Sequence, residues 1–164
     1  MLRASETLAA CDVVGGDARV FGRPYVVNEG RIEIGTGFVL SAIPICTHLV
    51  TGPLGSLRIG DRVYIGHGVS ISVHAELVIG DDVIIGPFAM LLDSDFHGVS
   101  DRDSRGPARP IHIGSGVRIG AGVVVLRGSV IGAGAVIEPN SVVSRYVPPG
   151  SKASGVPARP LYRR

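Results

Sequence analysis

Large aromatic side chains are scarce in this chain. Tryptophan is absent from its 164 residues, and Phe, Tyr and Trp together make up 5% of them. A core built on aromatic rings is therefore excluded, and smaller side chains must fill the interior. Hydrophobic residues still account for 45% of the chain, and glycine occurs 24 times. This combination favours many short strands ended by tight turns, because β-branched side chains fit a pleated sheet and glycine adopts positive φ angles.

Charged residues are also few. They make up 18% of the chain and leave a formal net charge of +2, which is too small to indicate a nucleic-acid or anionic-membrane partner. The last twenty residues nevertheless carry several basic side chains and no acidic one. The basic residues are Arg145, Lys152, Arg159, Arg163 and Arg164. Such a tail either contacts a phosphate or is simply solvated.

Cysteines and long apolar runs are scarce as well. Cys11 and Cys46 have neither the spacing of a disulfide framework nor that of a zinc site, and we expect both to be buried or inert. No apolar run approaches the roughly 20 residues of a membrane span. Residues 1–14 make a poor signal peptide, because Glu6 and Asp12 interrupt their apolar stretch. We expect one soluble, cytoplasmic domain without a membrane span.

Aliphatic residues recur every six positions along most of the chain. The unbroken series is Ile113, Ile119, Val125, Ile131, Ile137 and Val143, with apolar or small residues two positions before each. The same phase runs upstream through Ile59 and Ile71, shifts by two residues near His74, and resumes at Ile79. We interpret the shift as a widened turn.

A six-residue period predicts an all-β solenoid. It does not fit an amphipathic helix, whose apolar face recurs about every 3.6 residues, or a sandwich, whose turns recur about every 8–12 residues. Three repeats would close one turn of a triangular prism, and successive turns would pair as parallel strands about 4.8 Å apart. The open ends need caps. We assign about residues 1–31 to an N-terminal cap and residues 147–164 to a C-terminal extension.

The repeat is interrupted once, by the polar segment 92–110. This segment carries Asp93, Asp95 and His97 among other charged residues. Functional residues favour loops that rigid elements hold in place, and a long excursion from such a regular coil is unusual. We therefore predict that this segment is an active-site loop.

Residues 57–160 resemble the hexapeptide-repeat acyltransferases, most closely the sugar and polysaccharide O-acetyltransferases. The resemblance rests on the repeat, the Asp-x-Asp-Phe-His motif at 93–97, the Ile-Gly repeat that resumes at Ile113, and the endings Val147-Pro148-Pro149-Gly150 and Gly155-Val156-Pro157-Ala158-Arg159. It implies a left-handed parallel β-helix and a homotrimer that binds acetyl-CoA between subunits. The left hand departs from the usual right-handed crossover and is implied by the resemblance alone.

The resemblance also implies catalytic roles. His97 would act as a general base, because a neutral imidazole takes the proton from a hydroxyl as it attacks the thioester. Asp95 or Asp93 would orient the imidazole, although either carboxylate also suits turn amides. The backbone amide of Ala121, which follows Gly120, would stabilise the oxyanion.

Several positions are assigned to acetyl-CoA in the same way. Ser144 and Arg145 stand where relatives contact the phosphate end of the cofactor, and Arg159 is a further candidate. Pro139 lies where relatives hold the pantetheine arm, but proline has no N–H to donate. Arg118 stands where relatives commonly carry an aromatic residue.

The acceptor side departs from the sugar acetyltransferases. Where those enzymes have Asn and Asp, this chain has Gly66 and His67, followed by His74. We take His67, His74 and Asp93 as candidate substrate-binding residues. The acceptor itself stays open.

Other functions compete with this interpretation. γ-Class carbonic anhydrases share the solenoid and bind zinc through three histidines, but His67 and His74 are seven positions apart rather than five, so we predict no metal site. Serine acetyltransferases share the Gly-Val-Pro-Ala-Arg ending but carry a large helical amino-terminal region. A non-catalytic scaffold is a further alternative, because Pro139 and Arg118 break the expected lining.

The sequence thus predicts acetyl transfer from acetyl-CoA to a hydroxyl of a sugar or secondary metabolite. N-acetylation of an amino sugar is the alternative reaction.

Overall fold

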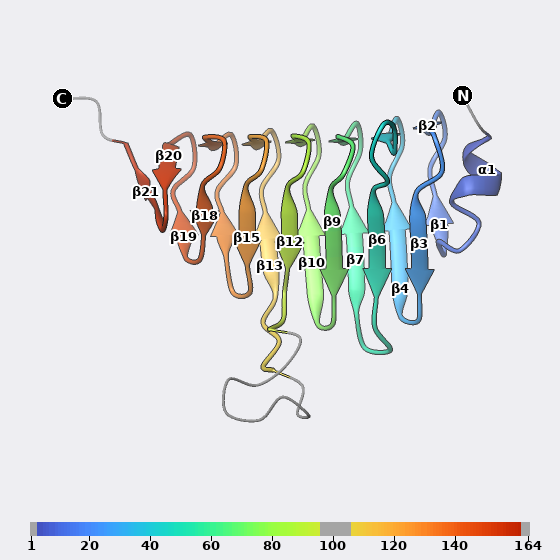
Figure 1. The fold of residues 1–164 in the computed structure, drawn as a ribbon, viewed down its shortest axis with the longest axis horizontal. Coiled ribbons are helices and arrows are strands. Elements are labelled where there is room, and N and C mark those ends of the chain that lie inside the picture. The colour runs from blue at the N-terminus through green and yellow to red at the C-terminus, as the bar shows by residue number, and fades with distance from the viewer. Residues whose placement is uncertain (1–2, 96–105, 162–164) are drawn as a thin grey trace.

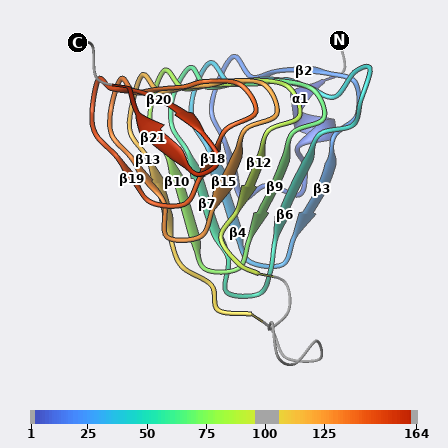
Figure 2. The ribbon, with the colours of Figure 1, turned by 60° about the vertical axis from the view of Figure 1, so that its left-hand side comes forward.

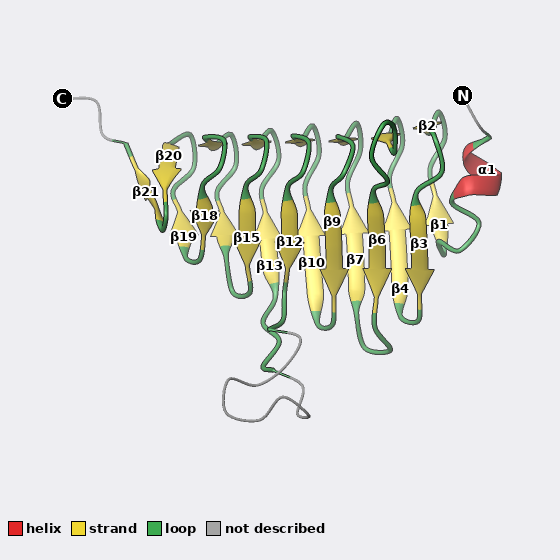
Figure 3. Ribbon diagram, viewed as in Figure 1, coloured by secondary structure: helices red, strands yellow, loops and turns green. Residues whose placement is uncertain are grey.

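The computed structural model describes residues 3–95 and 106–161, which form a coil of short parallel strands (Figure 1). Strands and turns make up almost all of it (Figure 3). The seven-stranded sheet has the order β1 (Val13–Val14), β4 (Arg31–Ile34), β7 (Ser56–Ile59), β10 (Glu76–Ile79), β13 (Ile111–Ile113), β16 (Val130–Ile131) and β19 (Tyr146–Val147). The eight-stranded sheet has the order β2 (Arg19–Phe21), β5 (Val39–Ser41), β8 (Tyr64–Ile65), β11 (Ile84–Ile85), β14 (Arg118–Ile119), β17 (Val136–Ile137), β20 (Lys152–Gly155) and β21 (Ala158–Pro160). The six-stranded sheet has the order β18 (Val142–Val143), β15 (Val124–Leu126), β12 (Met90–Leu92), β9 (Ser70–Val73), β6 (His48–Thr51) and β3 (Tyr25–Asn28).

Each turn of the coil adds one strand to each sheet, so the three sheets form the faces of a prism whose coils stack along its axis (Figure 2). The register keeps the aliphatic repeat in columns. Along the seven-stranded sheet, Ile59 pairs with Ile79, Ile79 with Ile113, and Ile113 with Ile131. All four side chains are buried. The predicted solenoid with a narrow aliphatic core is confirmed.

The two-residue shift near His74 does not widen the turn, contrary to our interpretation. The strands on either side, β9 and β10, are four residues long, and only His74 and Ala75 separate them. In the later coils the strands of the same two sheets have two or three residues. The extra residues therefore lengthen the two faces, and the chain turns sharply at His74.

The two ends of the prism are closed differently. At the N-terminal end lies the helix α1 (Ala4–Thr7), and Leu8 behind it is buried in the core. The coil begins at β1, so it already occupies much of the 1–31 range that we assigned to a cap. At the other end β21 folds back antiparallel onto β20. The single helix of the described residues is four residues long, too short to cross a membrane.

Both cysteines lie near the N-terminal end. Burial and the neighbouring Asp12 carboxylate raise the pKa of the Cys11 thiol to about 11, which fits the expectation that this thiol is inert. Cys46 is exposed, so burial does not protect its thiol. It lies in the segment between β5 and β6, where the chain leaves the regular coil.

Each edge of the prism is a column of turns, and we name the three edges for use below. The loop corner joins the six-stranded to the seven-stranded sheet and contains residues 52–55, 74–75, 93–95, 106–110, 127–129 and 144–145. The alanine corner joins the eight-stranded to the six-stranded sheet and contains residues 42–47, 66–69, 86–89, 120–123 and 138–141. The aspartate corner joins the seven-stranded to the eight-stranded sheet and contains residues 35–38, 60–63, 80–83 and 114–117.

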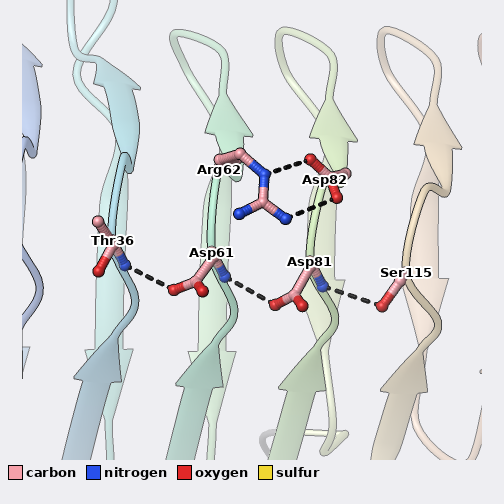
Figure 4. A network of polar contacts seen from close by, with 6 residues as sticks. All are labelled: Thr36, Asp61, Arg62, Asp81, Asp82 and Ser115. Atoms are coloured by element: carbon pink, nitrogen blue, oxygen red, sulfur yellow. Dashed lines mark hydrogen bonds and ion pairs between the residues drawn. The ribbon is translucent and has the colours of Figure 1, made fainter.

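A polar ladder fastens successive coils at the aspartate corner (Figure 4). The amide of Thr36 donates to Asp61, that of Asp61 to Asp81, and that of Asp81 to the Ser115 hydroxyl, over 2.7, 2.8 and 3.1 Å. Beside it, the Arg62 guanidinium binds both carboxylate oxygens of Asp82 at 2.7 and 2.9 Å. Hydrogen bonds from Arg62, and its charge, lower the pKa of Asp82. These side chains satisfy turn amides and each other, which indicates a structural role.

Candidate active site at the loop corner

The loop leaves the coil between two strands of adjacent faces. β12 ends at Leu92 and β13 begins at Ile111, as the break in the repeat predicted (Figure 1). A bridge between Ser94 and Ala108 and a hydrogen bond from the Arg109 amide to the Asp93 carbonyl oxygen, 2.8 Å, close its base. His97, the predicted general base, lies outside the described residues. The base of the loop is thus fixed to the coil.

Asp93 secures the neighbouring turn of the coil. Its side chain is 1% exposed. The carboxylate accepts hydrogen bonds from the His74 amide at 2.8 Å and the Ala75 amide at 2.7 Å. Both oxygens are therefore used by the sharp turn between β9 and β10. This geometry favours the turn-amide interpretation of Asp93 over a role in binding the substrate.

His74 lies against the base of the loop. Its Nδ1 is 3.1 Å from the Ser94 hydroxyl and 3.9 Å from the nearer Asp93 oxygen. A Ser-His-Asp triad requires the hydroxyl and the carboxylate to contact opposite nitrogens of the ring. Here both approach the same nitrogen, so this cluster does not form a nucleophilic triad. It places a partly exposed imidazole beside the predicted active-site loop instead.

Asp95 points to the coil on the other side of the loop. Its carboxylate forms an ion pair with the Arg127 Nε over 2.7 Å, and both side chains are partly exposed. A cavity of about 220 Å³ opens here and is lined by Asp95, Arg109, Leu126, Arg127 and Ser144. The structure thus brings Asp95 and Ser144 together, two residues that the sequence assigned to different roles.

Arg109 and Arg127 were not among the predicted site residues. A signal for Arg127 is present in the sequence, since a charged residue follows the apolar Val124–Leu126 run at a turn. Its importance emerges only when the coil places it opposite Asp95, 32 positions away in the chain. Arg109 lies in the segment that we predicted to be functional, but nothing in its local sequence distinguishes it from the other arginines there.

The remaining predicted catalytic position, Ala121, lies at the alanine corner. It is exposed and follows β14 and Gly120. Across residues 3–95 and 106–161, its amide donates to no acceptor. The equivalent positions on the adjacent coils are Pro87 and Pro139, as the bonds from Gly122 to Pro87 and from Asn140 to Ala121 show. Neither proline has an N–H, so Ala121 presents an isolated free donor.

His67 also lies at the alanine corner, away from His74. Its ring packs edge-on against Phe88, with 5.1 Å between the ring centroids. His67 and His74 are therefore separated by the strand β9 and do not form one substrate-binding group within a chain.

The predicted acetyl-CoA contacts are distributed over the molecule. Ser144 and the exposed Arg145 follow β18 at the loop corner. Pro139 is exposed at the alanine corner, where a Cβ on Gly120 would lie 2.6 Å from its nitrogen. Arg159 is exposed on β21 at the C-terminal end of the prism. One chain therefore does not gather all of these positions into a single cleft.

The described histidines are similarly dispersed. His48 packs on Tyr25 on the six-stranded sheet, and His112 lies on the seven-stranded sheet near Glu76. No three His, Cys, Asp or Glu side chains in the described part of the chain converge as metal ligands would.

The fold and repeat define a left-handed parallel β-helix of the hexapeptide-repeat class. A family model described as bacterial transferase hexapeptide (six repeats) matches residues 110–145. The first turns after the loop thus carry the characteristic repeat, and the resemblance noted in the sequence is confirmed.

Proteins similar to this chain include acetyltransferases. A probable acetyltransferase of Mycobacterium tuberculosis is 31% identical over 159 residues, which cover 86% of this chain and 53% of the relative. The chain thus spans about half the length of that protein. A hexapeptide-repeat acetyltransferase of Vibrio cholerae, solved with acetyl-CoA, is 27% identical with a TM-score of 0.71, over 98% of this chain and 75% of the other. A galactoside acetyltransferase solved with coenzyme A is 25% identical with a TM-score of 0.66, over 98% and 68%.

Proposed function

We propose that this protein transfers an acetyl group from acetyl-CoA to a hydroxyl of a sugar or secondary metabolite, with His97 as the general base. The observation that carries the proposal is the loop anchored at the loop corner, with Asp95 at its base. Support also comes from the acetyl-CoA and coenzyme A bound to the two solved relatives, and from the sugar named for one of them.

In the proposed reaction His97 takes the proton of the acceptor hydroxyl while its oxygen attacks the thioester carbonyl carbon. The Ala121 amide donates to the oxyanion that forms. When this intermediate collapses, the carbon–sulfur bond breaks and the imidazolium returns its proton to the coenzyme A sulfur. The products are the acetyl ester and free coenzyme A, and no acyl-enzyme is needed.

The same proposal favours a site made from more than one chain. Ala121 and the base of the loop lie on opposite edges of the six-stranded sheet. The six residue steps from Ala121 to Arg127 span up to about 20 Å at 3.3 Å per residue. A base and an oxyanion donor that act on one carbonyl must both be within hydrogen-bond reach of it. We therefore propose a homotrimer in which the loop of one subunit faces the alanine corner of the next.

Exposed apolar side chains support this assembly. They gather at and beside the alanine corner, and they include Tyr25, Ile43, Ile45, Phe88 and Met90. Each is at least 40% exposed in the single chain. Clustered exposed apolar residues typically mark an interaction surface.

The decisive measurement of the activity is thiol release from acetyl-CoA with a panel of sugars and amino sugars. We expect His97→Ala to lower turnover by about 10²–10⁴-fold while coenzyme A still binds. The matched control is His112→Ala, which removes an exposed histidine from the seven-stranded sheet.

Unchanged turnover in His97→Ala would refute the mechanism. Nuclear magnetic resonance of the product distinguishes an ester from an amide. If amino sugars give an amide, the acceptor group is an amine and not a hydroxyl. If no acceptor in the panel causes thiol release from acetyl-CoA, and coenzyme A does not bind, a non-catalytic scaffold would be favoured.

A further inference from the structure

The cavity at the loop corner has the donors of an anion site. Its volume is about 220 Å³, and Arg109, Arg127 and Ser144 line it together with Asp95 and Leu126. Two guanidinium groups against one carboxylate leave a net positive charge. Arg145, which follows Ser144, adds to it at the exposed edge of the same corner. This excess is local, because the whole chain carries a formal net charge of only +2.

Arg127 is held by one edge of its guanidinium. The carboxylate of Asp95 engages Nε at 2.7 Å, and neither terminal nitrogen has a partner among the described residues. Arg62 at the aspartate corner provides a contrast, since both its Nε and a terminal nitrogen bind Asp82. The ion pair with Asp95 therefore orients Arg127 while leaving its two terminal amino groups free to donate.

Arg109 is positioned by its backbone. Its amide donates to the Asp93 carbonyl at 2.8 Å, and its carbonyl accepts from the Gly128 amide at 3.2 Å. Its side chain runs over Gly128, where a Cβ would lie 3.5 Å from the Arg109 Cδ. Within the described part of the chain its guanidinium forms no ion pair with a carboxylate. The coil thus presents a second cation without its own counter-ion.

We propose that this cavity binds a carboxylate or phosphate group of the acceptor substrate, so that the acceptor is an acidic sugar or a comparable anionic metabolite. The planar guanidinium fork matches both groups. The assignment rests on the proposed acetyl transfer. Asp95 precedes His97 by two residues, so their Cα atoms are at most about 7 Å apart. Asp95, which lines the cavity, thus lies only two residues along the chain from the proposed general base.

The resemblance placed Ser144 and Arg145 at the phosphate end of coenzyme A. The acceptor assignment replaces that expectation, because the phosphates of coenzyme A fit this place less well. The pantetheine arm separates these phosphates from the thioester, and the thioester must lie beside the general base during transfer. The Asp95 carboxylate repels any anion that approaches it closely, from the acceptor as from coenzyme A, but it can accept hydrogen bonds from the hydroxyls of an acceptor. A mixed lining of two cations and one anion thus suits a ligand with both an acidic group and hydroxyls.

Binding measured by calorimetry tests the assignment without turnover. The probes are methyl glucuronide, glucose 6-phosphate and neutral methyl glucoside, each titrated into the assembled protein saturated with coenzyme A. We expect at least one anionic sugar to bind about tenfold or more tightly than methyl glucoside, because charge-assisted hydrogen bonds carry that discrimination.

Four variants locate the effect. Arg127→Gln and Arg109→Gln should each remove most of the preference for the anionic sugar, and Arg127→Lys should retain part of it as a point charge. Arg62→Gln is the matched control, since it also deletes an arginine paired with an aspartate, at the aspartate corner. It should leave the preference unchanged.

A parallel titration with coenzyme A and 3′-dephospho-coenzyme A separates the two sources of an anion. If Arg127→Gln weakens binding of coenzyme A but not of the dephospho form, the cavity holds the cofactor phosphate and the acceptor assignment is wrong. Equal affinity for charged and neutral sugars, or a preference that survives both glutamine variants, would also overturn it. Thiol release from acetyl-CoA in the presence of an acceptor is measured separately. If no release is found, the proposed reaction is wrong, but the binding result still stands.

Discussion

Asp93 and Asp95 show how two identical residues of one motif acquire different tasks. Asp93 is buried and its oxygens accept two backbone amides, whereas Asp95 is partly exposed and pairs with Arg127. The sequence placed both as candidates to orient His97, because the motif alone does not show which carboxylate is occupied. Amides contributed by the preceding coil favour a structural role for Asp93.

Replacing Asp93 by Asn should destabilise the fold. The amide keeps one acceptor oxygen but turns an NH₂ group toward a backbone N–H, which leaves a buried donor unsatisfied. We expect the free energy of unfolding to fall by about 1–3 kcal/mol in urea denaturation. In Asp95→Asn, which removes only a partly exposed ion pair, the loss should stay below about 1 kcal/mol. Equal losses in the two variants would contradict the separate roles.

At the scale of elements, the coil depends on close stacking of its corners. At the alanine corner the amides of Gly66, Gly86 and Gly120 each donate to a carbonyl of the next coil, over 2.8–2.9 Å. A Cβ on any of them would approach backbone atoms of that coil within 3 Å. Glycine is thus required there for lack of space between coils.

Gly120→Ala tests this stacking, with Gly16→Ala as its control. The new methyl would lie 2.6 Å from the Pro139 nitrogen, whereas a Cβ on Gly16 has nothing within 4 Å. We expect Gly120→Ala to lower the free energy of unfolding by about 1–3 kcal/mol, as overpacking does. Gly16→Ala should be neutral or stabilise by up to about 1 kcal/mol. The comparison fails if thermal denaturation gives the same midpoint for both.

The sequence predicted the elements well because one period controls them. Six-residue spacing predicted the three-sided parallel coil, and its long polar break located the loop between Leu92 and Ile111. The spacing did not reveal whether the shift near His74 widens a turn or lengthens strands, since both keep the same residues buried. Arg109 and Arg127 were missed because the number of residues in each full turn of the coil decides which side chains meet between successive coils. His97 stays a prediction.

At the scale of the molecule, the three corners of the prism differ in kind. The aspartate corner is a ladder of side chains that satisfy amides and one another. The loop corner gathers Asp95, two arginines and Ser144 around a cavity. The alanine corner offers a free amide beside exposed apolar side chains. The last two corners lie on opposite edges of the six-stranded sheet, so in the proposed reaction they would come from neighbouring copies.

Mixing two inactive variants tests this sharing directly. His97→Ala removes the base from the loop, and Ala121→Trp blocks the alanine corner, so each should be inactive alone. In trimers that contain both kinds of chain, one site combines an intact loop with an intact corner. Random co-assembly should therefore restore about a quarter of the wild-type activity, because three quarters of such trimers are mixed and each has one of three sites intact. Mixing His97→Ala with the double variant should restore none. Sedimentation of the mixture gives the mass of the assembly. A stable monomer with full activity would exclude a site shared between subunits. So would the absence of recovered activity in mixtures shown to contain both chains.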